Sequence, residues 1–86
     1  MNTDTKIQSW MVSPVKTKKY RVILSNGKKV DFGSSRHEQY RDSTPLKVYQ
    51  HLDHRDTRRK ELYYLRHKID YPIYTADWLS KTFLWN

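Results

Sequence analysis

Residues 18–33, KKYRVILSNGKKVDFG, decide the fold because their apolar pattern and central Asn-Gly pair predict a β-hairpin. A two-residue loop of Asn26 and Gly27 would mix apolar and polar side chains on each face of the hairpin. A three-residue loop that starts at Ser25, with Gly27 in the left-handed conformation, separates them. We therefore predict the three-residue loop. Its apolar face would consist of Tyr20, Val22, Val30 and Phe32.

A lone hairpin is only marginally stable in water, so it must pack against the segments that follow it. Three short helices are predicted, over about 44–52, 57–68 and 76–85. Their predicted capping residues are Thr44, Asp56 and Thr75.

In the second of these helices, Leu62, Leu65 and Ile69 recur at the spacing i, i+3, i+7, so we expect them to face the core. Ahead of the hairpin, the apolar cluster Trp10 to Val12 either frays or attaches to a partner or to the domain's own surface. The predicted fold class is a small single α+β domain over 17–86, a β-hairpin packed on two or three short helices. An extended N-terminal arm over 1–16 precedes it.

The composition limits the chain of 86 residues to one domain with a thin core. Hydrophobic residues make up only 36%, but the aromatic share of 14% supplies large side chains to bury. There is no cysteine, so a disulfide framework or thiolate metal site is excluded. No apolar run approaches the roughly 20 residues of a membrane span, and the first residues lack the apolar core of a signal peptide. We expect a soluble intracellular protein.

The net charge of +8 favours an anionic partner, either nucleic acid or an acidic protein surface. Basic residues gather on the hairpin and on the second predicted helix, where tyrosines interleave with them. The alternative is a solvated surface on which arginine stems cover aromatic rings. Trp10 and Trp85, near the two ends of the chain, are predicted to be partner-binding aromatics. The predicted polyanion- or partner-binding residues are Lys18, Lys19, Arg21, Lys28, Lys29, Arg55, Arg58, Arg59, Tyr63 and Arg66.

The sequence carries no recognisable catalytic motif. His51 and His54 lie near Asp53 and Asp56, but zinc needs at least three protein ligands and no further residue has ligand spacing. With only two glycines, a glycine-rich phosphate loop is excluded. We therefore expect a protein that is not an enzyme, with no metal, no cofactor and no small-molecule substrate.

Two stretches carry a resemblance: KYRVILSNGKKVDFGSSRHEQYRDSTPL at 19–46 and YQHLDHRDTRRKELYYLRH at 49–67. Together with the closing aromatic segment, they resemble a family of small basic proteins encoded by nucleocytoplasmic large double-stranded DNA viruses of eukaryotes. The resemblance covers roughly residues 18–85 and implies no catalytic residue.

This resemblance implies a virion structural protein, a minor capsid or capsid-associated component that bridges larger viral capsid proteins. Its location would be the virion, and the host cell cytoplasm during assembly. The alternative is a non-enzymatic DNA- or RNA-binding protein that uses the basic helix and hairpin. A third hypothesis is a protein that binds a host factor.

Overall fold

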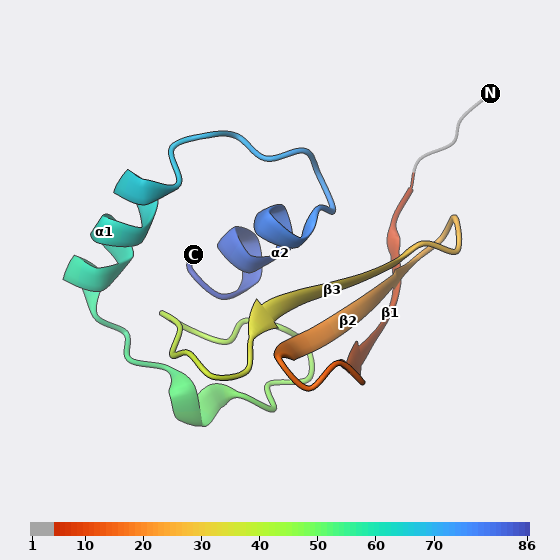
Figure 1. Cartoon of the computed structure of the whole chain (residues 1–86), viewed down its shortest axis with the longest axis horizontal. Coiled ribbons are helices and arrows are strands. Elements are labelled where there is room, and N and C mark those ends of the chain that lie inside the picture. The colour runs from red at the N-terminus through yellow and green to blue at the C-terminus, as the bar shows by residue number, and fades with distance from the viewer. Residues whose placement is uncertain (1–4) are drawn as a thin grey trace.

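Three antiparallel strands form one sheet in the order β1–β2–β3 (Figure 1). The computed structural model describes residues 5–86. The strands are β1 (Ile7–Val12), β2 (Lys18–Leu24) and β3 (Lys29–Ser34). With the helices α1 (Thr57–Arg66) and α2 (Ala76–Phe83), they make the small α+β domain that the sequence predicts.

The hairpin of β2 and β3 has the predicted register, with Val22 opposite Val30 and Tyr20 opposite Phe32. The backbone N–H of Leu24 donates to the carbonyl of Lys28 over 2.8 Å, which closes a loop of three residues. Gly27 in this loop has a φ of 89°, a conformation that glycine adopts without steric cost. The three-residue loop is therefore confirmed.

Strand β1 lies within the stretch that the sequence assigns to an extended arm. It pairs with β2, and Trp10 stands opposite the buried Val22. The indole ring is half-buried and meets the rings of Phe32 and Phe83 edge-on, at centroid distances of 6.1 and 4.8 Å. Trp10 thus attaches to the domain's own surface, which is one of the alternatives that the sequence leaves open.

Helix α2 closes the core by packing against β3. Its N-terminus is capped as predicted, because the Thr75 hydroxyl accepts a hydrogen bond from the backbone N–H of Trp78. Leu79 is fully buried, whereas Trp78 and Phe83 are half-buried against the core. The core cluster consists of Tyr20, Val22, Leu24, Phe32, Leu79 and Leu84.

The helix predicted over 44–52 is wrong, because only the short 3-10 helix η1 (Gln50–Leu52) forms there. The side chain of Asp42 accepts hydrogen bonds from both the backbone N–H and the hydroxyl of Thr44, at 3.0 and 2.6 Å. The backbone N–H groups of Val48 and Tyr49 donate to the Tyr20 hydroxyl instead of to helical carbonyls. Lys47, three residues after Thr44, has a φ of 53°, which no right-handed helix contains.

A buried polar network holds the long connection between β3 and α1 against the sheet. The Tyr20 hydroxyl on β2 donates to Asp42 and accepts from the backbone N–H groups of Val48 and Tyr49. The side chain of Asp53 accepts from the backbone of Asp42 over 2.7 Å. Because these contacts satisfy buried polar groups, a connection with few apolar residues can still pack closely.

Helix α1 begins as predicted, with the Asp56 carboxylate accepting from the backbone N–H groups of Arg58 and Arg59. The prediction that Leu62, Leu65 and Ile69 face the core is wrong, since their exposed fractions are 37%, 59% and 71%.

Tyr63 is the buried residue of α1, with 8% of its surface exposed. Its ring stacks on that of Trp85, with centroids 4.4 Å apart and an angle of 2° between the planes. The ring of His67 stacks on Tyr63 as well, at 4.2 Å and 25°. These contacts set which side of α1 faces inward, so Leu62 and Leu65 are left facing solvent.

The molecule is elongated, with principal extents of 43 × 27 × 19 Å. Helix α1 lies at one end of the long axis and the turn between β2 and β3 lies at the other (Figure 1). No helix among the described residues is long and apolar enough to cross a lipid bilayer.

Candidate functional site

The cations of the hairpin fall into three environments. Lys18, Lys28 and Lys29 are exposed. The guanidinium of Arg21 is held in a two-point ion pair with Asp31, at 2.9 and 3.0 Å. This contact also lowers the pKa of Asp31, because the hydrogen-bonded arginine favours the charged carboxylate. Arg21 is thus engaged across β2 and β3.

Lys19 is buried, with only 1% of its surface exposed, which corrects its assignment to a surface patch. Its ammonium group donates to the backbone carbonyl of His37 over 2.8 Å and lies 5.9 Å from the centre of the Tyr49 ring. Burial lowers the pKa of Lys19 to about 8, and the charges of Asp42 and Asp53 oppose this shift. Lys19 therefore belongs to the interior that fixes the connection, and a polyanion cannot reach it.

Four cations of the candidate set lie on or beside α1, at one end of the molecule. Arg59 makes a 2.8 Å ion pair with Glu38, and Arg58 approaches Glu61 only to 3.9 Å. Arg55 and Arg66 are exposed and have no ion pair with any acid of residues 5–86. Exposed pairs such as that of Arg58 contribute little to stability, so these guanidinium groups are available to a partner.

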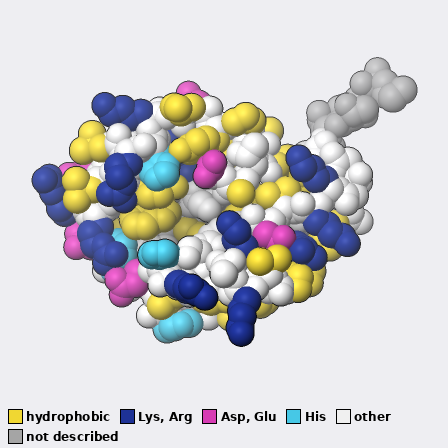
Figure 2. All heavy atoms as spheres, in the orientation of Figure 1, with side chains coloured by type: hydrophobic (Ala, Val, Ile, Leu, Met, Phe, Trp, Pro, Cys, Tyr) yellow, Lys and Arg dark blue, Asp and Glu magenta, His cyan; other side chains and the backbone are white. Residues whose placement is uncertain are grey.

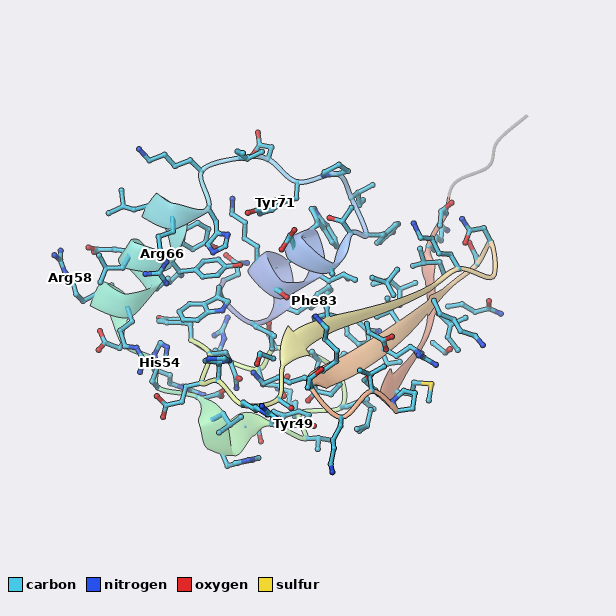
Figure 3. The ribbon with its side chains drawn as sticks, viewed as in Figure 1. Tyr49, His54, Arg58, Arg66, Tyr71 and Phe83 are labelled. Carbon is cyan, nitrogen blue, oxygen red and sulfur yellow. The ribbon has the colours of Figure 1, made fainter. Side chains whose placement is uncertain are left out.

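A shallow hollow of about 400 Å³ lies beside α1. Figure 2 shows histidine and hydrophobic side chains gathered at this end of the molecule, with Lys and Arg side chains around them, and Figure 3 shows Arg66 beside the hollow and Arg58 further out on α1. The hollow is lined by His37, Glu38, Arg59, Leu62, Tyr63, Arg66, His67 and Trp85.

The Tyr63 ring in this hollow is not free to stack on a nucleic-acid base. Tyr63 has Trp85 and His67 stacked on it, and the ring of His54 approaches Trp85 to 5.2 Å. Trp85, predicted to bind a partner, thus holds α1 in place. Tyr63 is also predicted to contact a polyanion or partner, and its burial corrects that prediction. The hollow offers a partner the edges of rings and the exposed Arg66, which suits an anionic protein side chain or a phosphate.

The histidines are engaged in local contacts. His54 accepts from the backbone N–H of Asp56 over 2.9 Å, and His51 stacks against Tyr49 at a centroid distance of 6.0 Å. Within residues 5–86, no three side chains of His, Cys, Asp or Glu come close enough to hold a metal ion. Ser34 and His37 resemble a nucleophile and its base, because the Ser34 hydroxyl lies 2.6 Å from Nδ1 of His37. The same two residues also share a backbone hydrogen bond, so this contact closes a turn.

More than half of the chain, residues 11–67, matches a family described as "Family of unknown function (DUF5754)". The chain belongs to the DUF5754 family. No curated protein and no solved structure matches it. The region shared with the family includes the β2–β3 hairpin, the polar connection and α1, whereas α2 and Trp85 lie beyond it.

The residues that the sequence interpretation missed are those of the polar network. The amide of Gln39 donates to Asp53 and to the carbonyl of Tyr49, and the backbone of His54 donates to the carbonyl of Gln39. The strings EQYRD and LDHRD are therefore neighbours in space. The two strings are distinctive in the sequence. Their contact with each other could not be predicted, because hydrogen bonds between distant polar residues leave no periodic pattern.

The buried Lys19 gives the first testable prediction. Stability rises with pH wherever the unfolded chain binds more protons than the folded one. For Lys19 this holds between the folded pKa of about 8 and the ordinary value of 10.5. We expect the free energy of unfolding to increase by on the order of 2 kcal/mol between about pH 8 and pH 10. The raised pKa of Tyr20 and of Tyr63, each about 12, reverses the trend at higher pH.

Urea unfolding at several pH values in this range measures the predicted rise in the free energy of unfolding. Lys19→Met should abolish the rise, while Lys18→Met, at the exposed neighbour, should retain it. An equal rise in the wild type and in Lys19→Met would show that another group is responsible.

Proposed function

We propose that this protein is a non-enzymatic assembly protein that bridges larger proteins. The observation that supports this best is the separation of its exposed cations. Lys28 and Lys29 lie at the turn between β2 and β3, and Arg58 and Arg66 lie on α1. The turn and α1 stand at opposite ends of a molecule 43 Å long (Figure 1). Two charged surfaces that face apart suit contact with two partners at once.

The setting that we propose is the virion, where the protein would be a minor capsid or capsid-associated component. The sequence resemblance to small basic proteins of large DNA viruses supports this setting. The thin core supports it too, because only seven hydrophobic residues among residues 5–86 are buried and much of the surface is left for contacts. Arginine and aromatic residues, which this chain has in number, are favoured in protein–protein interfaces.

Particle composition tests the proposal. We expect mass spectrometry of purified, gently stripped virions of the encoding virus to recover the protein at a fixed ratio to the major shell protein. A chain in which Arg58→Glu and Arg66→Glu are combined should fold but be incorporated at a much lower ratio, since it loses one of the two cationic ends. Absence of the wild-type protein from the particles would contradict the proposal.

The second candidate is a DNA- or RNA-binding protein. The specific observation in its favour is that Arg55, Arg66, Lys28 and Lys29 have no ion pair with an acid among residues 5–86. Phosphate contacts need only such free cations, whereas base stacking needs open ring faces, and those of Tyr63 are covered. Binding at this face should therefore depend on charge and not on stacking by Tyr63.

Salt dependence separates the two candidates. If the assembly proposal holds, binding to labelled duplex and single-stranded DNA should be weak and vanish near 150 mM salt, because few phosphate contacts form. Submicromolar binding at that salt concentration would favour the second candidate. It should then fall in the Arg58→Glu, Arg66→Glu chain and less in a charge-matched chain with Lys28→Glu and Lys29→Glu, if α1 is the binding face.

A further inference from the structure

The outer face of α1 carries apolar side chains that the fold leaves uncovered. Leu62 and Leu65 are one turn apart and so lie on the same side of the helix. They are 37% and 59% exposed, and Ile69, just beyond the end of the helix, is 71% exposed. In a chain with so few hydrophobic residues, placing three of them in water on one segment requires an explanation.

The rotation of α1 about its own axis makes this exposure a fixed property of the fold. The Tyr63 ring is stacked on Trp85, which follows α2, and the Lys60 ammonium lies 4.5 Å from the centre of the Tyr40 ring. Turning the helix to bury Leu65 would pull Tyr63 out of its stack.

The exposed leucines form a ridge between two shallow hollows. Leu62 lines the hollow of about 400 Å³ on the side of Trp85. Leu65 lines another of about 500 Å³, which it shares with Thr57, Lys60, Glu61 and Tyr64. A ridge with a groove on each side is the shape into which the side-chain rows of another helix pack.

Charge indicates which kind of helix fits. Arg58 and Arg66 stand beside the ridge and Arg59 is paired with Glu38, while Glu61 is the one acid within α1. We infer that the outer face of α1 is a docking site for an acidic amphipathic helix of a partner protein, whose apolar side chains cover Leu62 and Leu65 while its carboxylates meet the arginines. The inference rests on the proposed assembly function and names the chemistry of one of its partners.

Other occupants fit less well. In a second copy of this chain the same ridge is bordered by cations, so two copies would bring like charges together. A lipid surface is engaged by a broad apolar face, commonly with Trp or Phe, whereas this ridge has two leucines on a helix of ten residues.

Binding to a synthetic peptide tests the inference with the full chain. The probe is a fluorescein-labelled peptide of about 20 residues with leucines at helical i, i+3, i+4, i+7 spacing and glutamate on the other face. We expect micromolar binding that persists at about 150 mM salt. Leu62→Ala with Leu65→Ala should weaken it at least about tenfold, since alanine keeps the helix and removes only the ridge.

Three controls make the result specific. Val15→Ala with Ile73→Ala removes two exposed apolar side chains outside α1 and should leave peptide affinity unchanged. A peptide of the same composition with scattered leucines, and one with lysine in place of glutamate, should both bind at least about tenfold more weakly.

Two further measurements test the rival occupants. Sedimentation should show a monomer, and vesicles of phosphatidylcholine and phosphatidylserine should show no binding that depends on Leu62 and Leu65. Equal peptide affinity of the wild type and the ridge variant would overturn the inference, as would a dimer or vesicle binding lost with the ridge. If the wild-type protein is found in particles at a fixed ratio but does not bind the peptide, this inference alone is overturned. If the protein is absent from particles, the assembly function itself is overturned.

Discussion

The stack of Tyr63 on Trp85 is the contact on which the arrangement of α1 depends. A helix of ten residues is too short to be stable alone in water, so it must be held by tertiary contacts. The parallel rings, 4.4 Å apart, join α1 to the end of the chain that follows α2. Stacked aromatic pairs contribute about 0.5–1.5 kcal/mol beyond the area they bury, and they also fix orientation. Here the orientation has the greater consequence, because it turns the leucines outward.

The rest of the domain uses polar contacts where a larger protein would use apolar packing. The carboxylates of Asp42 and Asp53 and the hydroxyl of Tyr20 satisfy the backbone of a connection that has little else to bury. Such networks rigidify a fold when their members are paired, as all but the Oε1 atom of Gln39 are among the side chains that the network joins here. The buried Lys19 lies close to this network, and the nearby charges of Asp42 and Asp53 favour its ammonium form. The interior is thus committed to structure, and the exposed cations take no part in it.

The sequence predicts the parts of the fold that local pattern determines. The register of the hairpin follows from the alternation of apolar residues, and the caps at Asp56 and Thr75 follow from short-range hydrogen bonding. The prediction of a helix at Pro45 is wrong even though the Thr44 hydroxyl accepts from the backbone N–H of Lys47 as a cap would. The chain turns away at Lys47, and the next two backbone N–H groups donate to the distant Tyr20 hydroxyl.

The rotation of α1 could not be predicted. The spacing of Leu62, Leu65 and Ile69 is typical of a core face, but the stack between Tyr63 and Trp85 joins residues far apart in the sequence and outweighs it. Of the candidate binding residues, the exposed arginines are where the sequence places them. The burial of Lys19 and Tyr63 depends on tertiary contacts that no periodicity reveals.

Cysteine accessibility tests the central claim, that α1 turns its leucines to solvent, most directly. The chain has no cysteine, so a single introduced thiol reports one position. We predict that Leu65→Cys reacts with a thiol reagent within about tenfold of its rate in denaturant, while Leu79→Cys, at a fully buried position, reacts at least about 100-fold more slowly. A Leu65→Cys thiol as protected as that of Leu79→Cys would show that the leucine face of α1 is buried, and would contradict the account.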